Sequence, residues 1–149
     1  MSTILVLNGP NLGRLGSREP DVYGSADLDQ LRSTLTQAAP EGMTVDVRQT
    51  DDEAELIHWL YEAVDGCIPV ILNPAAFTHY SYALRDAAAL VTKAGVTLVE
   101  VHLSNPHARE TFRHTSVVSA VATGVIAGFG FDSYLLALDF IARSVPRTA

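Results

Sequence analysis

Apolar and polar residues along the chain fall into short segments of strand length and helix length. Ile4–Leu7 is a continuous apolar run, typical of a strand buried on both faces, and the Asn, Gly and Pro that follow end it. Met43–Gln49 alternates apolar and polar residues, which predicts a half-buried edge strand. Three further apolar runs predict strands at Pro69–Leu72, Val96–Val101 and Gly124–Gly130.

Helices are predicted between these strands. In Ser25–Ala39, apolar residues recur three or four positions apart, which is the stripe of an amphipathic helix that covers a sheet. Thr50 and Glu53 have the spacing of a capping box and predict the start of a second helix. Two more helices are predicted over Ser81–Leu90 and Ser133–Arg143.

This alternation of strands and helices predicts an α/β fold. Right-handed crossovers then give a doubly wound, five-stranded parallel sheet with helices on both faces. The 149 residues suit one domain, so residues 1–149 are expected to form a single catalytic domain. Ligands of such sheets bind beyond the carboxyl ends of the strands, where polar residues stand at Asn8–Asn11, Asn73 and His102–Asn105.

Composition narrows the class of protein. With 48% hydrophobic and 18% charged residues the chain is not disordered, and its longest apolar runs are too short to cross a bilayer. The first residues read as a strand and not as a signal peptide, which favours a cytoplasmic protein. The formal net charge of −7 argues against a nucleic-acid partner. The single cysteine, Cys67, excludes an internal disulfide and is expected to be a small buried side chain.

The first loop offers candidates for binding and for base catalysis. Asn8–Asn11 lacks the glycine spacing of a dinucleotide fingerprint and the end of a phosphate loop, so no nucleotide cofactor is expected. The glycines of Gly13–Gly24 allow a mobile flap that carries Arg18 and Tyr23. A neighbouring guanidinium lowers the pKa of a phenol by roughly 1–3 units, which would make Tyr23 a base. From spacing alone, Tyr23 as a hydrophobic anchor remains open.

The fourth predicted strand ends in a candidate general acid. Glu100 and His102 share one side of the strand, because alternate residues of a strand face the same way. A carboxylate can fix the tautomer and the charge of an imidazole, as a general acid requires. A purely structural pair of these two residues remains open.

The residues after this strand predict a carboxylate site. Ser104 or Asn105 would cap a helix with Pro106 at its first position, so that free N–H groups and the helix dipole point into the cleft. Arg109 and Arg113, four apart, would lie on this short helix and add positive charge, unless they are surface residues. The histidines of the chain do not have a zinc-site spacing, and no metal is expected.

Long blocks of the chain resemble the type II 3-dehydroquinate dehydratases. These blocks are NGPNLGRLGSREPDVYG at Asn8–Gly24, ILNPAAFTHYSYALRDA at Ile71–Ala87, VEVHLSNPHARETFRH at Val99–His114, and ATGVIAGFG before Tyr134. The resemblance implies a flavodoxin-like sheet and an anti elimination of water from 3-dehydroquinate through an enolate, without metal or organic cofactor.

The resemblance also implies roles for individual residues. Tyr23 would be the base, activated by Arg18, and Asn11 would hold a water at the enolate oxygen. His102, supported by Glu100, would protonate the departing hydroxyl, and Arg109 would support the electrostatics around the tyrosine. Substrate binding would fall to Asn73, His79, Arg113, the backbone of Leu103 and Ser104, and Asp86 of a neighbouring subunit. Members of the family assemble as trimers packed into dodecamers, so a homo-oligomer is expected.

Three other readings compete with this one. Tyr80 and Tyr82 replace smaller residues of the family beside His79, and rings that narrow the pocket would suit a related cyclic polyol acid. A carboxylate-binding protein without turnover and a flavin- or nucleotide-binding flavodoxin-like protein are the other two.

Overall fold

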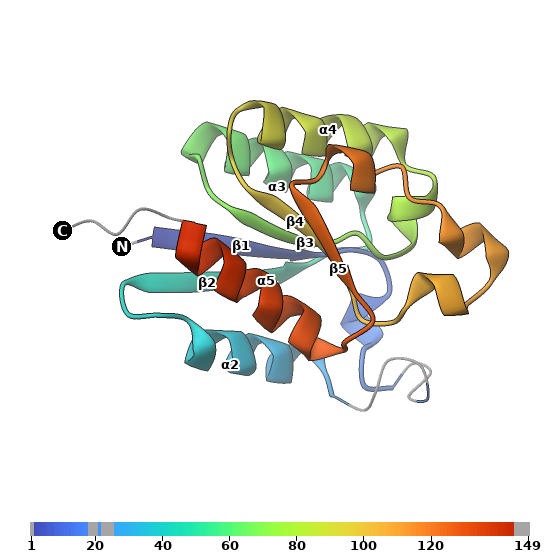
Figure 1. Ribbon diagram of the computed structural model, residues 1–149, viewed down its shortest axis with the longest axis horizontal. Helices are drawn as coiled ribbons and strands as arrows, with labels where there is room; N and C mark the ends of the chain where they lie inside the picture. Colours follow the sequence, from blue (N-terminus) through green and yellow to red (C-terminus); the bar gives the residue numbers. More distant parts are fainter. Residues whose placement is uncertain (1, 18–20, 22–25, 145–149) are drawn as a thin grey trace.

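The computed structural model describes residues 2–17, 21 and 26–144 of the chain. It contains five strands, each connected to the next through helical segments (Figure 1). The strands are β1 (Ser2–Asn8), β2 (Met43–Gln49), β3 (Val70–Asn73), β4 (Leu98–His102) and β5 (Gly124–Ala127). The α-helices are α2 (Leu28–Ala38), α3 (Glu53–Gly66), α4 (Tyr82–Lys93) and α5 (Phe131–Ser144). Short 3-10 helices are η1 (Leu12–Arg14), η2 (Ala75–His79), η3 (Pro106–Ala108), η4 (Thr111–His114) and η5 (Ser119–Val121).

The strands form one parallel sheet in the order β2-β1-β3-β4-β5. The order reverses at β1, which makes the sheet doubly wound, as the alternation of elements predicts. β2 lies at one edge and is only partly buried, which confirms the interpretation of its alternating pattern. All five strands predicted from the sequence are present; Met43–Gln49 has the predicted bounds, and the ends of the others differ by at most three residues.

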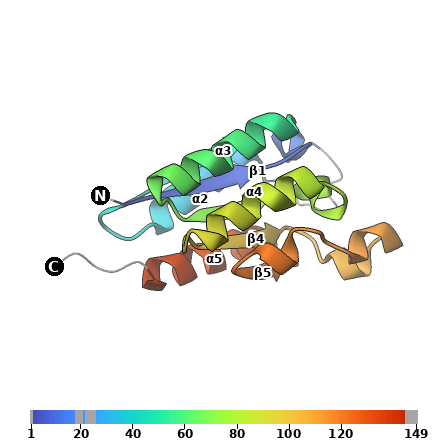
Figure 2. The same ribbon diagram turned by 90° about the horizontal axis from the view of Figure 1, so that it is seen from above.

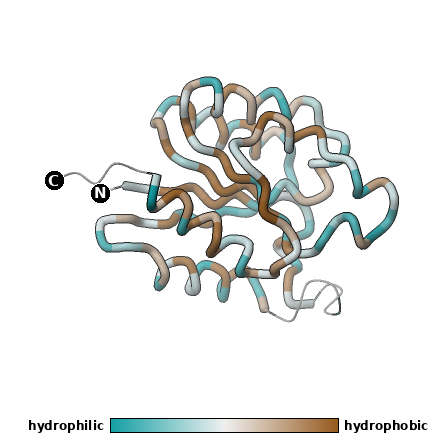
Figure 3. Tube along the Cα trace, in the orientation of Figure 1, coloured by the Kyte–Doolittle hydropathy of each residue, from teal (hydrophilic) through white to brown (hydrophobic). Residues whose placement is uncertain are grey.

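Two apolar layers hold the helices against the sheet. On one face, Leu31 and Leu35 of α2 pack with Ala137 and Ile141 of α5 over the sheet. On the other face, α3 and α4 cover the alternate side chains of the same strands. Figure 2 shows the helices on both sides of the sheet, and Figure 3 shows the strands as the hydrophobic centre of the molecule. Within the described residues, no helix is long and apolar enough to span a membrane.

The start of α3 differs from the predicted capping box. The N-cap is Asp52, whose carboxylate accepts a hydrogen bond from the Ala54 N–H, and not Thr50. The Thr50 hydroxyl instead accepts from the Asp52 N–H and forms the turn before the helix. The prediction was wrong because two side chains that can cap a helix stand two residues apart, and the one nearer the helix does so.

Cys67 is exposed, contrary to the expectation of a buried side chain. It ends α3 in the left-handed conformation, with φ of 51°. A residue at this position turns the chain out of the helix, so its side chain is directed by the turn and not by the apolar stripe of the helix.

A buried tyrosine links α5 to the ends of two strands. The Tyr134 hydroxyl donates to Asn8 Oδ1 (2.6 Å) and accepts from Asn73 Nδ2 (2.8 Å). Asn8 Nδ2 in turn donates to the Arg48 carbonyl (3.0 Å). Burial raises the pKa of the Tyr134 phenol well above its usual range, although the hydrogen bond from Asn73 acts in the opposite direction. This tyrosine is therefore a structural donor and not a base.

Replacing Tyr134 by Phe is expected to lower the free energy of unfolding by about 1–3 kcal/mol, because two buried amide groups lose a partner. Urea denaturation of the variant and the wild type measures the difference. Tyr61→Phe is the matched control, since Tyr61 is 43% exposed and the change should stay within about 0.5 kcal/mol. Equal midpoints for Tyr134→Phe and wild type would contradict the role of the hydroxyl.

Candidate active site

The carboxyl ends of β1 and β3 lie side by side and form the floor of a cavity. Asn8 is in register with Asn73, and the Gly9 N–H donates to the Asn73 carbonyl (2.8 Å). A Cβ on Gly9 would stand 2.6 Å from the Pro74 carbonyl oxygen, so only glycine fits at this position. The close approach of these two backbones explains the glycine of the first loop.

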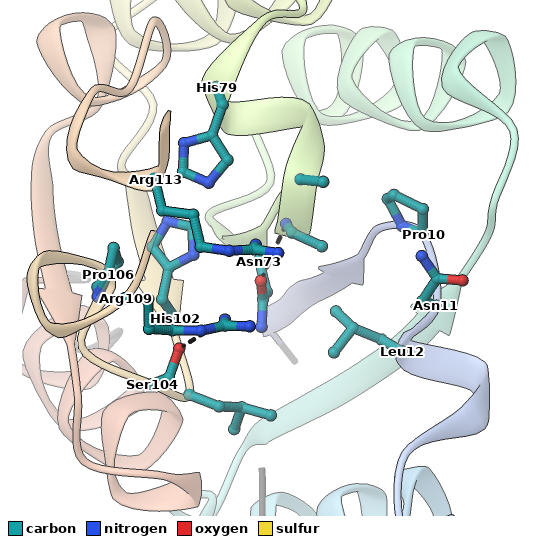
Figure 4. A pocket seen from close by; sticks show the side chains of 13 residues that line it. Pro10, Asn11, Leu12, Asn73, His79, His102, Ser104, Pro106, Arg109 and Arg113 are labelled. Atoms are coloured by element: carbon teal, nitrogen blue, oxygen red, sulfur yellow. Dashed lines mark hydrogen bonds between the residues drawn. The ribbon is translucent and has the colours of Figure 1, made fainter. Parts of the chain in front are cut away.

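The cavity collects residues from the loops after β1, β3 and β4, as the rule for ligand sites in parallel sheets predicts. In Figure 4, His79, His102, Arg109 and Arg113 extend toward the cavity from one side, and Asn11 lies on the other side. The described lining consists of Pro10, Asn11, Leu12, Asn73, Ala75, Ala76, His79, His102, Leu103, Ser104, Pro106, Arg109 and Arg113.

His102 and Glu100 form the predicted pair at the end of β4. His102 Nε2 lies 2.5 Å from Glu100 Oε2, and the carboxylate is almost fully buried. With the carboxylate ionised, Nε2 carries a hydrogen and donates it to Glu100, so the Nδ1 nitrogen is the one that can exchange a proton with a ligand. The pair has the arrangement that a general acid needs.

Glu100 is ionised despite its burial. Burial alone would raise the pKa of this carboxyl, but hydrogen bonds from His102, Ser119 and Thr78 and the charge of His102 together hold the pKa below its usual value. A charged, fixed carboxylate behind an imidazole stabilises the protonated ring. The proton that such a ring carries is available to a leaving group in the cavity.

His79 stands at the cavity in a different electrostatic state. Burial lowers the pKa of its imidazole, and the nearby charges of Arg113 and His102 lower it further, while the contact with Thr115 acts in the opposite direction. His79 Nδ1 lies 2.8 Å from the Thr115 carbonyl, which can only accept, so Nδ1 carries the hydrogen. The neutral ring then offers Nε2 as an acceptor for a hydroxyl.

Two arginines give the cavity its positive charge. Arg109 Nη1 donates to Ser104 Oγ (3.2 Å), and Arg113 Nε contacts both oxygens of the exposed Glu110 at 3.2 Å. The hydrogen bond from Arg113 holds the pKa of the Glu110 carboxyl below its usual value. Both guanidinium groups remain at the cavity, where they can bind an anionic substrate.

The prediction for the segment after β4 is confirmed for the cap at Asn105 with Pro106 next to it, but it is wrong in placing Arg109 and Arg113 on one helix. η3 is a 3-10 helix of three residues, Pro106–Ala108, and Arg113 belongs to a separate element, η4. The Asn105 side chain caps the turn by accepting from the His107 N–H (3.1 Å). So short a segment aligns too few peptide dipoles to attract a carboxylate, so the positive charge comes from the arginines.

The remaining candidates fall into three groups. Asn11 lies at the cavity in the left-handed conformation, and its N–H donates to Asp51 Oδ1 (2.8 Å). Asp86 is exposed on α4, contacts Arg85 and is not part of the lining of its own subunit. Arg18 and Tyr23 lie outside the described residues.

Tyr80 and Tyr82 do not narrow the cavity. Their exposed fractions are 58% and 71%, and neither residue belongs to the lining. Tyr80 follows η2 and Tyr82 begins α4. The reason for favouring a related cyclic polyol acid is thereby removed.

Sequence reasoning missed several polar residues behind the cavity. Tyr134 orients Asn73, and Thr78, Ser116 and Ser119 surround Glu100. No sequence spacing identifies these residues as part of the site, because each is distant from its partner in the sequence and meets it only in the folded structure. Within residues 2–17, 21 and 26–144, no group of three or more His, Cys, Asp and Glu side chains is arranged to hold a metal ion.

Fold and site together define an acid–base enzyme that acts on a small anionic substrate at the carboxyl edge of a flavodoxin-like sheet. The family model of class II dehydroquinases matches residues 2–142, and the chain belongs to this family.

Relatives match along almost their whole length. The 3-dehydroquinate dehydratase of Salinispora tropica is 59% identical over 140 residues, which cover 93% of this chain and 96% of the relative. The enzyme of the same name from Mycobacteroides abscessus is 58% identical over 143 residues, with 95% and 97% covered. The crystal structure of type II dehydroquinase from Propionibacterium acnes superposes with a TM-score of 0.91 at 49% identity and covers 96% of this chain and 97% of that one.

Proposed function

We propose that this protein is a 3-dehydroquinate dehydratase, a hydro-lyase that removes water to form the conjugated enone 3-dehydroshikimate. The observation that carries the proposal is the His102–Glu100 pair beside Arg109 and Arg113 in one cavity, in a chain of the class II dehydroquinase family. A ketone α-proton is weakly acidic, so the reaction needs a base, a stabiliser for the enolate oxygen and an acid for the leaving hydroxyl. Each of the three has a candidate in this chain.

The reaction begins with removal of the proton beside the ketone by Tyr23, which Arg18 keeps in its phenolate form. A water held by Asn11 stabilises the enolate oxygen. The electron pair of the enolate then forms the new double bond as the hydroxyl departs, and His102 protonates this hydroxyl with Glu100 holding the ring. The acid and the base act on opposite faces of the substrate, in keeping with an anti elimination.

Substrate recognition divides between charge and hydrogen bonds. The backbone N–H groups of Leu103 and Ser104 bind the carboxylate, Arg113 donates to a ring hydroxyl, and His79 accepts from a ring hydroxyl through Nε2. Asn73 has one N–H of its amide free for substrate, because the other donates to Tyr134 and its oxygen accepts from the Ala75 N–H. Arg109 supports the charge of the phenolate and of the enolate.

The functional form is proposed to be a homo-oligomer, a dodecamer built from trimers. Asp86 is exposed on α4 and does not reach the cavity of its own subunit, as expected for a residue that completes the site of a neighbour. Sedimentation velocity at assay concentration measures the number of subunits. The enzyme would act in the cytoplasm, in the shikimate pathway that leads to aromatic amino acids.

The first test is turnover of 3-dehydroquinate, followed by the ultraviolet absorbance of the enone product with a metal chelator present. Steady turnover that the chelator does not change supports a dehydratase without a removable metal. Absence of turnover from folded, assembled protein would contradict the proposal, and binding of the same compound measured by calorimetry would then identify a carboxylate-binding protein without catalysis.

A further inference from the structure

Three hydroxyl groups lie behind the catalytic pair and contact the Glu100 carboxylate directly or through one another. The Ser119 hydroxyl donates to Glu100 Oε1 (2.6 Å), and the Thr78 hydroxyl donates to Oε2 (2.7 Å), the oxygen that also faces His102. Ser116 Oγ lies 2.6 Å from Thr78 Oγ1. These residues, Thr78, Ser116 and Ser119, are called the hydroxyl cage below.

The cage connects backbone N–H groups to the Glu100 carboxylate through a chain of hydrogen bonds. Since the single hydrogen of the Thr78 hydroxyl goes to Glu100, Ser116 donates to Thr78, and its 3.5 Å contact with Glu100 Oε2 is the weaker of its two donor contacts. Ser116 Oγ in turn accepts from the N–H groups of Val118 (3.1 Å) and Ser119 (3.0 Å). In such a chain each hydrogen bond polarises the next, which strengthens the last bond to the anion.

The fold holds the cage by backbone hydrogen bonds. The Thr78 carbonyl accepts from the Val117 N–H (2.7 Å), and the neighbouring Thr115 carbonyl accepts from the His79 ring (2.8 Å). Thr78 is itself buried, with 1% of its surface exposed. One short segment, residues 115–119, therefore supports the two histidines of the cavity, one directly and one through Glu100.

A buried carboxylate needs such donors. Without them, burial favours the neutral acid, which would no longer stabilise a protonated imidazole. A neutral Glu100 could either donate a hydrogen bond to the His102 ring nitrogen or accept one from it, so the ring would no longer be held in a single tautomer. The described structure leaves no buried polar side-chain atom near the pair without a partner.

We propose that Thr78, Ser116 and Ser119 are positioning residues, which keep Glu100 ionised and fixed so that His102 stays in one tautomer as the proton donor. The kinetic consequences of this positioning role rest on the dehydratase function proposed above. None of its residues lines the cavity that Asn73, Ser104 and Arg109 line; Thr78, Ser116 and Ser119 line a second cavity, which shares His79, His102 and Arg113 with the first.

Ser119→Ala and Thr78→Val are expected to lower kcat about 10- to 100-fold each, because each removes a hydrogen bond to a charged group. KM should change less than about threefold, since only the proton transfer is affected. Thr78→Ser keeps the hydroxyl and should restore most of the rate. Steady-state kinetics of the three variants measure these effects.

The pH profile separates positioning from a general loss of structure. The hydrogen bonds from Ser119 and Thr78 help to hold the pKa of the Glu100 carboxyl below its usual value, so removing one of them raises this pKa, and the acid limb of kcat should move up by about 0.5–1 pH unit. The other groups that face this region are unchanged in the variants: His79 on η2, His107 on η3, and Arg113 and His114 on η4. A mere loss of stability would not move the limb.

Thr92→Val is the matched control. The Thr92 hydroxyl donates to the Val121 carbonyl (2.8 Å) and so ties α4 to η5, the element that carries Ser119, without touching Glu100. This variant should keep the kcat and the pH profile of the wild type. The same losses in Thr92→Val, or a wild-type kcat and pH profile in Ser119→Ala, would overturn the proposal.

A substrate-free measurement keeps this proposal distinct from the dehydratase function. The titration of the Glu100 carboxyl, followed by nuclear magnetic resonance of its side-chain carboxyl carbon, should move to higher pH in Ser119→Ala and stay unchanged in Thr92→Val. If the wild type does not turn over 3-dehydroquinate, the proposed function fails while this titration still decides the role of the cage. No movement in Ser119→Ala would overturn the positioning role.

Discussion

His102→Ala is expected to lower kcat by roughly 10²–10⁴, the scale for losing a general acid. The imidazole is the donor group held by the buried Glu100, and the remaining hydrogen bonds of Glu100, from Thr78 and Ser119, persist without it. KM should change little, so that kcat and kcat/KM fall together. The absorbance of the enone product measures both quantities.

A matched control comes from a histidine far from the cavity. His58 is exposed on α3, and His58→Ala should leave kcat and the urea midpoint near those of the wild type. If His102→Ala keeps a kcat within about threefold of the wild type while remaining folded, another group protonates the leaving hydroxyl and the assignment of His102 is wrong.

Tyr23→Phe is expected to cost a similar factor, roughly 10²–10⁴ in kcat, because the variant lacks the group that takes the α-proton. Tyr23 lies outside the described residues, and its role comes from the resemblance of Asn8–Gly24 to the family. The other tyrosine near the site, Tyr134, cannot replace it, because burial raises the pKa of that phenol well above its usual range. Turnover of the Phe variant near the wild-type rate would remove Tyr23 from the mechanism.

His79 is the strongest rival base among the described residues. Its lowered pKa leaves the ring neutral near pH 7, with Nε2 as an acceptor. We expect His79→Gln to raise KM about tenfold and to lower kcat less, since a glutamine oxygen can still accept from a substrate hydroxyl. A large loss of kcat in His79→Gln together with an active Tyr23→Phe would transfer the role of base to His79.

Deuterium exchange separates the base from the acid. In heavy water, His102→Ala should still remove the α-proton and return a deuteron, so deuterium enters unreacted 3-dehydroquinate without product formation. Tyr23→Phe should show neither exchange nor product. Proton resonances of the substrate measure this directly, and exchange in Tyr23→Phe at the rate of His102→Ala would contradict a separate base.

The order of elements and the edge that carries the site could be predicted from the sequence. Apolar runs of strand length alternate with amphipathic stripes, and this alternation is a local property that the backbone period imposes. The contact between Glu100 and His102 follows from the same rule, because two residues on one face of a strand are neighbours in any fold. The arginines could be named as candidates because they are positively charged residues a few positions after this strand.

The local ends of elements were harder to predict. The N-cap of α3 is Asp52 and not the predicted Thr50, and Cys67 at the end of the same helix is exposed and not buried. In place of the single helix predicted after β4 there are two short 3-10 helices. Each outcome depends on a competition between neighbouring side chains or on packing across the sheet, and the free-energy differences are too small for a sequence pattern to rank.

The sequence by itself determined the sheet, the polar edge and the contact between Glu100 and His102, because these follow from the periods of helices and strands and from the chemistry of single residues. Only the tertiary structure decided which side chains stand behind that pair. Ser119 lies nineteen positions from Glu100, and Tyr134 lies 126 positions from Asn8, yet each reaches its partner at 2.6 Å. Contacts between such distant positions depend on the crossing of whole elements over the sheet, and no local pattern encodes them.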